Sequence, residues 1–477
     1  MARKRVIAAA LAAVLLLIWE LHIISSVGAF MGDFRAFACA GAALAHGQNP
    51  YAAAALYNCE RTPMPLGLYH ALAGVAVPAP LPGYAIVLFV PFGVLPYLLA
   101  CALWLLVLLA SSILAFVTLA RLLHRPLDAA IWALAAGFAV IVIPFGELGS
   151  IVFAALLCAG LYVRAGSWTA AAIAVGCAMI LPHVALPAVL AAFCFLPRMR
   201  VPLIVVAAVL AVVDVLAGGL HTAVSYVTTV LPEHARSEIG STAQYGLTWI
   251  LHGVGASDSV AVTGGELSYA VMVLLGVLVA GQMLRRTADT AYVMLIPPAF
   301  AMLGGTFVHL TQIMIAIAPA LLLYDRSRGP ARLALGAAAL LLAFPWAWIL
   351  GQPPLMAVFA IGAAGLAATA LDADASVCLR VAFASVLIGG AIVVAGFHFG
   401  AGVPAHVHGI AGASQGLAQA GWGEYIRSQR SSSGPVWWIA KAPTWVGLIL
   451  LPLSCAFVLA KKDFVLPVAV EQVPVTP

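Results

Sequence analysis

Charged residues are scarce in this sequence. Only 8% of the 477 residues are Asp, Glu, Lys or Arg, whereas 64% are hydrophobic. The surface of a water-soluble domain needs far more charge, so this composition excludes a soluble protein. The short alternating segments of a membrane β-barrel are missing too. We therefore expect an all-α, polytopic membrane protein. We interpret the net charge of +5 through membrane topology, and it indicates no nucleic-acid partner.

Long apolar runs fill the chain from end to end. Most have about 17–25 residues, the length that a helix needs to cross the hydrocarbon layer of a bilayer. We expect a bundle of about 12–14 transmembrane helices. The predicted spans are 6–27, 96–122, 128–145, 150–165, 168–183, 184–197, 201–217, 262–284, 290–306, 308–324, 331–350, 354–371, 378–398 and 444–460. Prolines break the apolar stretch 81–95, which predicts re-entrant or interfacial helices after the first span.

The basic residues indicate how the chain is oriented. With the N-terminus inside, most of the 22 Lys and Arg residues lie at inner ends of spans, as the positive-inside rule requires. Three long outer segments result, at about 28–80, 218–261 and 399–443. The start of the chain also has signal-peptide features, but its apolar stretch continues past Trp19, so we favour a retained first helix. We expect a multi-pass protein of the inner cell membrane.

Cysteine patterns that bind zinc are missing, although the chain has eight cysteines. Cys39 and Cys59 both lie in the first outer segment, where an oxidising compartment would allow a disulfide. We favour two unpaired thiols. Asp372 and Asp374 form a DxD spacing, but the predicted topology places them in a solvated inner loop. No acidic pair on the outer face demands a metal, and we expect no cofactor.

Histidines and acids gather on the predicted outer face. Of the twelve histidines only His124 is clearly inner. Ionisable groups without a structural need are functional candidates in so apolar a protein. The outward acids are Glu20, Asp33, Glu60, Glu147, Glu233, Glu238, Asp258 and Glu424. The sequence therefore predicts a functional site on the outer face.

Asp33 begins the stretch "DFRAFACAGAALAHG", just beyond the first span. Apolar residues recur there at helical spacing, Gly47 fits a helix C-cap, and Pro50 prevents continuation. Asp is also a favoured helix N-cap, so capping alone would explain Asp33. Catalysis is the alternative interpretation.

Several motifs of this chain resemble family 87 of the GT-C glycosyltransferases. Asp33 is followed by "AGAALAHGQNPY" and then by "PGYAIVLFVPFGVLP" running into "ALWLLVLL". "GELGSIVFAALLCAG" resembles the family's Gly-Gln stretch, with Glu147 in place of glutamine. "AAIAVGCAMILPHVALP" resembles its Lys-Pro segment, with His183 at the lysine position. "STAQYGLTWIL" matches through Gln244 and Tyr245, and "GGTFVHLTQIMIAIAPALLL" through Thr306 and His309.

The resemblance implies a GT-C catalytic module over residues 1–325, followed by further transmembrane helices with an outer loop over 326–477. It implies transfer of mannose or a related sugar from a polyprenyl-phosphate donor to a glycolipid or glycan acceptor at the outer face. Asp33 would be the general base. Binding of the donor phosphate or other substrate groups would fall to His309, His183, Arg236, Arg61, Glu147, Gln244 and Tyr245. Glu147 is either paired with a basic group or structural.

A membrane transporter or a flippase for lipid-linked sugars is the main alternative. Such a protein needs ionisable groups near the bilayer midplane and paired halves with broken helices. Here only Asp214, and near span ends Glu266, Gln282 and Arg380, fall inside spans. Within the outer stretch "VLPEHARSEIGSTAQYG" we expect a solvated loop, from which we single out Arg236 as a substrate-binding candidate.

Overall fold

The computed structural model describes residues 2–27, 30–62, 74–127, 142–350, 352–371, 375–400, 416–428 and 434–460. Helices are the only regular elements in these ranges, beside two isolated β-bridges. Five of the described helical segments are long and apolar enough to cross a membrane: Tyr97–Leu122, Pro197–Ser237, Asp258–Thr287, Ala382–Phe399 and Pro435–Ala460. The all-helical class is therefore confirmed, together with several helices of membrane-spanning length.

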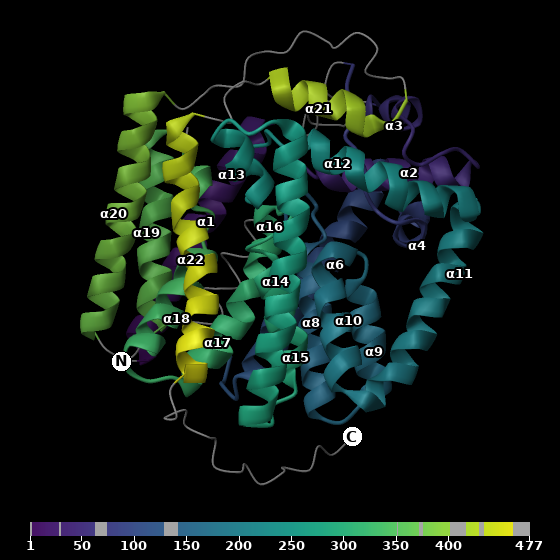
Figure 1. Cartoon of the computed structure of the whole chain (residues 1–477). Coiled ribbons are helices and arrows are strands. Elements are labelled where there is room, and N and C mark those ends of the chain that lie inside the picture. Colours follow the sequence, from purple (N-terminus) through teal and green to yellow (C-terminus); the bar gives the residue numbers. More distant parts are fainter. Residues whose placement is uncertain are drawn as a thin grey trace.

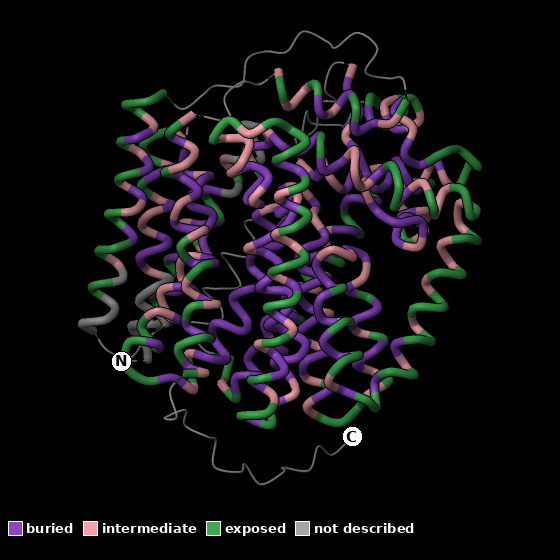
Figure 2. Tube along the Cα trace, in the orientation of Figure 1, coloured by how far each residue is buried: buried purple, intermediate pink, exposed green. Residues whose placement is uncertain are grey.

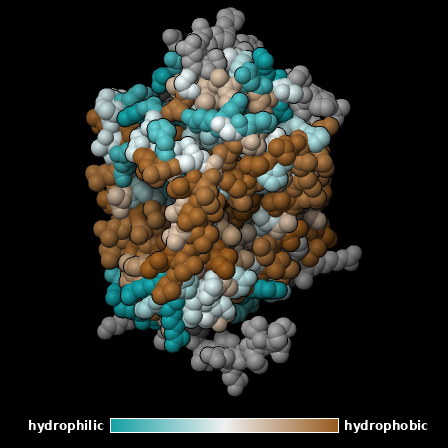
Figure 3. All heavy atoms as spheres, turned by 90° about the vertical axis from the view of Figure 1, so that its right-hand side faces the viewer, coloured by the Kyte–Doolittle hydropathy of each residue, from teal (hydrophilic) through white to brown (hydrophobic). Residues whose placement is uncertain are grey.

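The long helices stand side by side in one bundle, and short helices lie across one end of it (Figure 1). We call this end, marked by α2 (Gly32–Ala45), α3 (Ala53–Glu60), α12 (Leu231–Ser237) and α21 (Ala418–Ser428), the site end. Figure 3 shows, on the face turned to the viewer, a broad apolar band across the middle, with polar side chains gathered toward both ends. Such a band is what the hydrocarbon layer of a bilayer requires.

The other described helices follow the predicted apolar runs closely. Of the predicted span 128–145, only residues 142–145 are described, and residues 143–145 form a turn. Asp372 and Asp374 lie outside the described residues. The helices are α1 (Ala2–Val27), α4 (Gly83–Ile86), α5 (Val90–Val94), α6 (Tyr97–Leu122), α8 (Gly149–Arg164), α9 (Trp168–Ala178), α10 (Pro182–Phe195), α11 (Arg200–Ser225), α13 (Leu247–Gly253), α14 (Asp258–Thr287), α15 (Ala291–Ala301), α16 (Leu310–Ile313), α17 (Ile317–Arg326), α18 (Gly329–Leu342), α19 (Pro354–Leu371), α20 (Ala375–Phe399) and α22 (Pro435–Ala460).

Small residues let α2 pack directly on the broken segment 83–94. A Cβ atom on Gly41 would lie 2.4 Å from the backbone carbonyl of Phe89, and one on Gly93 would lie 2.4 Å from the backbone nitrogen of Ala42. The two backbones therefore touch, and only glycine fits at these two positions. This contact holds α2, and with it Asp33, against the bundle.

Cys39 and Cys59 form a disulfide between α2 and α3. The expectation of two unpaired thiols is wrong. The two helices pack against each other, which brings the cysteine Cα atoms to 5.6 Å, a separation that a disulfide spans. Sequence spacing alone did not contain this information, because the loop between the cysteines has many conformations.

Helix α11 stands at the edge of the bundle, and Leu203 is its single buried residue (Figure 2). Its apolar side chains are exposed on most sides, as expected for a helix that is surrounded by lipid. Asp214 sits within this helix and accepts a hydrogen bond from the backbone N–H of Tyr84, 2.8 Å away. This ionisable group therefore has a structural partner, because it fastens α11 to the start of α4.

Candidate functional site

His309 lies between two carboxylates at the site end. Its Nδ1 is 3.9 Å from Oε1 of Glu147, and its Nε2 is 3.5 Å from Oε2 of Glu238. The three residues come from distant parts of the chain: Glu147 precedes α8, Glu238 follows α12, and His309 precedes α16. Only 5% of the Glu238 side chain is exposed, so this is a largely buried charge cluster.

Asp33 joins this cluster through a turn that is bonded to the start of α2. The backbone N–H groups of Met31 and Asp33 donate to the carbonyl oxygens of Pro144 and Phe145, at 2.6 and 3.0 Å. The Glu147 carboxyl group lies close enough to Asp33 to act on the pKa of the Asp33 carboxyl group. Gly146 (φ +74°) permits the close approach, since its Cα faces Phe34 and a Cβ there would lie 2.6 Å from that side chain.

Asp33 is not the helix cap that its sequence position suggests. Met31 is the N-cap of α2, with φ 58° and no side-chain cap bond, and Asp33 lies within the first turn. A carboxyl group there still benefits from the positive end of the helix dipole. The capping interpretation is therefore wrong.

Burial and neighbouring charge set the protonation of the cluster. Burial raises the pKa of Asp33 well above its usual range, and the Glu147 carboxylate beside it adds to the effect. Burial acts against the charged form of His309, but its contacts with Glu147 and Glu238 outweigh this and raise the pKa to about 10. Burial also disfavours ionised Glu238, but His309 and the Trp422 indole lower its pKa to about 2. At neutral pH His309 is thus an imidazolium beside the Glu238 carboxylate.

The sequence placed Glu238 among the outward acids, but we chose neither Glu238 nor Trp422 as a binding residue. Trp422, on α21, donates its indole N–H to Oε1 of Glu238 at 2.5 Å. The expected solvated loop is in part a helix with two faces: His234 and Glu238 are buried, whereas Glu233 and Arg236 are exposed and paired with each other at 2.5 Å. The i,i+4 spacing of His234 and Glu238 was the available signal, because such residues share one face of a helix.

Gln244 and Tyr245 lie behind the His309 loop. Gln244 is fully buried, and its Oε1 accepts the backbone N–H groups of Tyr245 and Gly246, both at 3.1 Å, and that of Val308. Its Nε2 donates to the carbonyl oxygen of Thr306 at 3.3 Å. These bonds place Gln244 as a support of the loop. The predicted binding role of the two residues stays a prediction.

His183 lies in the first turn of α10 and is linked to His309 of the charge cluster through Gln312. Its Nε2 is 3.2 Å from Oε1 of Gln312, which also accepts the backbone N–H of His309. The Phe307 ring packs against His183 at 4.7 Å between ring centres. His183 and His309 thus share Gln312 as a partner, which the sequence did not single out.

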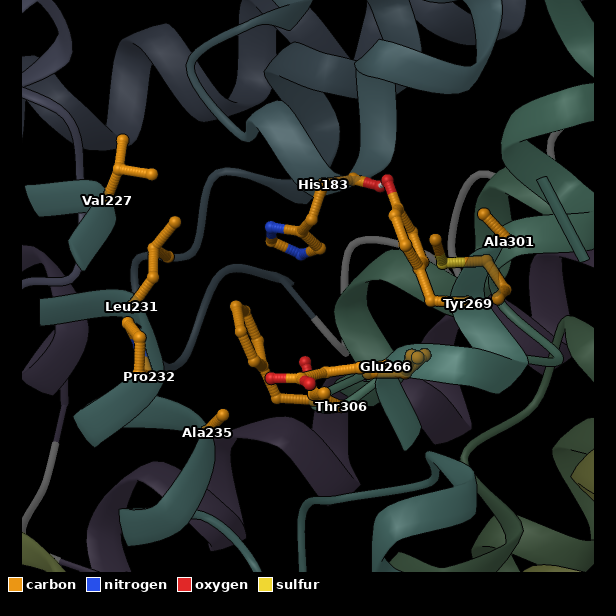
Figure 4. A pocket seen from close by; sticks show the side chains of 13 residues that line it. His183, Val227, Leu231, Pro232, Ala235, Glu266, Tyr269, Ala301 and Thr306 are labelled. Atoms are coloured by element: carbon orange, nitrogen blue, oxygen red, sulfur yellow. Dashed lines mark hydrogen bonds between the residues drawn. The ribbon is translucent and has the colours of Figure 1, made fainter. Parts of the chain in front are cut away.

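A cavity of about 280 Å³ opens beside His183 (Figure 4). Apolar groups of Val227, Leu231 and Phe307 line much of it, and Glu266 and Tyr269 of α14 form the facing side. Arg236 extends from α12, whose Ala235 lines the cavity. Arg61 is exposed just after α3. The cavity therefore combines an apolar wall with polar groups near the cluster.

Across the described residues, no group of three or more His, Cys, Asp and Glu side chains has the arrangement needed to hold a metal ion. No family model, curated protein or solved structure matches the chain. The fold and the cluster together define an all-helical protein with helices of membrane-spanning length and a buried carboxyl–histidine site at one end. The resemblance to family 87 stays a prediction.

Proposed function

We propose that this protein is a membrane glycosyltransferase of the GT-C type. It moves a sugar, mannose or a related hexose or pentose, from a polyprenyl-phosphate donor to a glycolipid or glycan acceptor at the outer face of the inner membrane. The observation that carries the proposal is the position of Asp33. This carboxyl group lies beyond the first apolar helix, joins the Glu147–His309–Glu238 cluster, and has a part-apolar cavity nearby.

The reaction needs a base where an acceptor hydroxyl meets the sugar. The hydroxyl oxygen attacks the anomeric carbon and forms the new glycosidic bond, while its proton passes to the Asp33 carboxyl group. The bond between the anomeric carbon and the phosphate oxygen breaks, and polyprenyl phosphate leaves with the bonding electrons. A direct displacement of this kind inverts the donor's linkage.

The charge of the cluster suits the transition state of this transfer. Positive charge develops on the sugar ring as the phosphate departs. The cluster brings three carboxyl groups, those of Asp33, Glu147 and Glu238, together with the single imidazole of His309. An acidic centre stabilises a cationic ring and repels a phosphate. We therefore place the donor phosphate toward His183, with its polyprenyl chain along Val227, Leu231 and Phe307.

A transfer assay tests the proposal. Membranes that contain wild-type, Asp33→Asn or Asp258→Asn protein receive a radiolabelled polyprenyl-phosphate sugar, and label is counted in extracted lipid and glycan. Asp33→Asn should lower transfer by about 100-fold or more. Asp258 is exposed at the start of α14, so its matched substitution should leave transfer unchanged.

Retained transfer by Asp33→Asn would refute the base assignment. Movement of the lipid-linked sugar across vesicles, without transfer by any form, would favour the flippase.

A further inference from the structure

Gln312 lies between the two histidines of the site, and one oxygen of its side chain contacts both. This atom, Oε1, is 3.3 Å from the backbone nitrogen of His309 and 3.2 Å from Nε2 of His183. His309 is the N-cap of α16 and Gln312 is the third residue after it, a spacing at which a glutamine side chain returns to the backbone of the N-cap. Gln312 is also buried. Its amide is therefore held in place by the start of the helix.

The backbone of His309 fixes which end of the Gln312 amide faces the two histidines. A backbone N–H only donates, so the amide atom opposite it must be the oxygen. That oxygen only accepts, so the His183 nitrogen beside it must carry a proton. A neutral imidazole has a single N–H, and its second nitrogen is a bare acceptor. In neutral His183 the proton is therefore on Nε2, and Nδ1 is bare.

The surroundings of the His183 ring favour its neutral form. Among the described residues no carboxylate forms an ion pair with this ring, whereas His309 faces two carboxylates. An imidazolium without a carboxylate partner is disfavoured away from water. The Phe307 ring packs on His183 and also on His234, at 4.7 and 4.9 Å between ring centres. The ionisable groups around the ring are His234, His309 and Glu147 in the site, and Glu266 and Tyr269 across the cavity.

His183 lines the cavity in which the proposed function places the donor phosphate (Figure 4). Nε2 is engaged by Gln312, so Nδ1 is the ring nitrogen left for a ligand. A phosphate oxygen and a bare ring nitrogen are both acceptors, and two acceptors bond only through a proton. A phosphate that binds His183 must therefore bind together with a proton on Nδ1.

We infer that Gln312 is a positioning residue that keeps the His183 proton on Nε2, and that a lipid phosphate binds at Nδ1 with uptake of one proton from solvent. The identity of this lipid phosphate as the sugar donor rests on the proposed function, whereas the fixed Nε2 proton does not. Binding forms an imidazolium beside the phosphate anion, an arrangement suited to the charge that develops on the leaving group.

The protons of the whole cycle balance. After transfer, the departing phosphate oxygen holds the electron pair of the broken bond and takes the Nδ1 proton. The lipid phosphate then leaves as a monoanion, and His183 is neutral again. Asp33 returns to solvent the proton that it received from the acceptor hydroxyl. One proton is thus taken up and one is released in each turnover.

Nuclear magnetic resonance of protein with isotope-labelled histidine rings, reconstituted in lipid, reports which ring nitrogens carry a proton. The signals that disappear in His183→Gln belong to His183. At neutral pH and without ligand, Nε2 should be protonated and Nδ1 should be bare. A proton on Nδ1 beside a bare Nε2 would overturn the role of Gln312.

Farnesyl methyl phosphate tests the proton uptake, because this polyprenyl phosphodiester keeps one negative charge at every pH used. Its binding should add a proton to Nδ1 of His183. The affinity should fall by about tenfold for each pH unit, over the range in which the free ring is neutral and the bound ring is charged. His183→Gln should lose this dependence on pH. Binding that leaves Nδ1 bare, with an affinity independent of pH, would overturn the proton uptake.

Two further probes separate the phosphate from the chain. Farnesol has no phosphate and should leave Nδ1 bare. Dimethyl phosphate has no polyprenyl chain and should bind at least about tenfold more weakly, because it covers none of the apolar wall. Equal affinity for dimethyl phosphate and farnesyl methyl phosphate would overturn a lipid phosphate as the ligand.

Variants of Gln312 separate positioning from packing. Gln312→Glu keeps an acceptor for both N–H groups and adds a negative charge, so His183 should be protonated before any ligand binds and the pH dependence at neutral pH should be lost. Gln312→Met keeps the length of the side chain without the amide, so the His183 proton should divide between both nitrogens. The exposed Gln282 of α14 supplies the matched control, and Gln282→Glu should behave as wild type. A wild-type pattern of ring protons in Gln312→Met would contradict the positioning role.

This inference and the proposed function fail in different ways. Binding of the lipid phosphate with proton uptake, but without sugar transfer by any form, would overturn the proposed function and leave the inference standing. Sugar transfer by wild-type protein whose Nδ1 stays bare in the lipid-phosphate complex would overturn the inference and leave the transferase standing.

Discussion

Lys441 of α22 donates a hydrogen bond to the backbone oxygen of Gln244 across 2.5 Å. Its side chain is fully buried, and Nζ lies 3.8 Å from the centre of the Trp249 ring. Gln244 in turn bonds the loop that ends at His309. The last described helix, α22, therefore supports the candidate site. This contact joins the two parts of the chain that we predicted to be separated at residue 325, and that boundary stays a prediction.

Gln244→Leu should destabilise the protein by at least about 2 kcal/mol, because the buried N–H groups of Gly246 and Val308 lose their acceptor, whereas that of Tyr245 keeps the Val308 carbonyl oxygen. Thermal unfolding in detergent measures the change. Gln419→Leu is the matched control: Gln419 is equally buried, but its side-chain polar atoms have no hydrogen-bond partner among the described residues. The control should be neutral or stabilising. Equal losses in both variants would contradict the support role.

The His309–Glu238 pair should make stability depend on pH in a defined window. The pKa of His309 rises from 6.5 to about 10, so its contribution is complete below about 6.5 and is lost as the pH rises through 10. The pKa of Glu238 falls from 4.5 to about 2, so its contribution is complete above about 4.5 and is lost as the pH falls through 2. Both contributions are complete between about pH 4.5 and 6.5.

The double variant His309→Gln/Glu238→Gln removes both charges at once. The difference in unfolding temperature between wild type and this variant should be greatest between about pH 4.5 and 6.5 and should shrink on either side. Thermal unfolding over a pH series measures it. A constant difference over the whole series would show that the two groups do not titrate as an ion pair.

Gly41→Ala should destabilise the protein by about 1–3 kcal/mol through overpacking. The added Cβ would meet backbone atoms of Phe89, which cannot move aside as a flexible side chain does. Gly390→Ala is the control, since a Cβ added there in α20 would meet no side chain and no other helix within 4 Å, and alanine is a better helix former. Transfer activity should fall with Gly41→Ala, because α2 carries Asp33, and should be unchanged in the control.

Loss of the Cys39–Cys59 disulfide should cost about 3 kcal/mol, since the bond closes a loop over a sequence separation of 20. The double variant Cys39→Ser/Cys59→Ser tests this by thermal unfolding, and thiol labelling of wild-type protein before and after reduction verifies the bond. Cys177→Ser replaces an exposed free cysteine and should have no effect. Labelling of Cys39 or Cys59 without reductant would contradict the pairing.

Local pattern was sufficient for the helices of this protein. Apolar runs, prolines and turn residues act over a few neighbouring positions, so the sequence by itself determined the helical class, most helix positions and the broken segment 83–94. It also determined that Asp33 follows the first apolar helix. It did not determine the partners of Asp33, because nothing local relates residue 33 to residues 147, 238 and 309.

Packing between distant helices decided the rest. Contact of α2 with α3 made the disulfide, and the face that α12 turns inward buried Glu238 while Arg236 stayed in solvent. The turn at Gly146 brought Glu147 to Asp33, and the loop held by Gln244 brought His309 between two carboxylates. The few charged residues of this chain are easily identified in the sequence. Their pKa values and interactions depend on neighbouring groups, which come from distant parts of the chain and are brought together by folding.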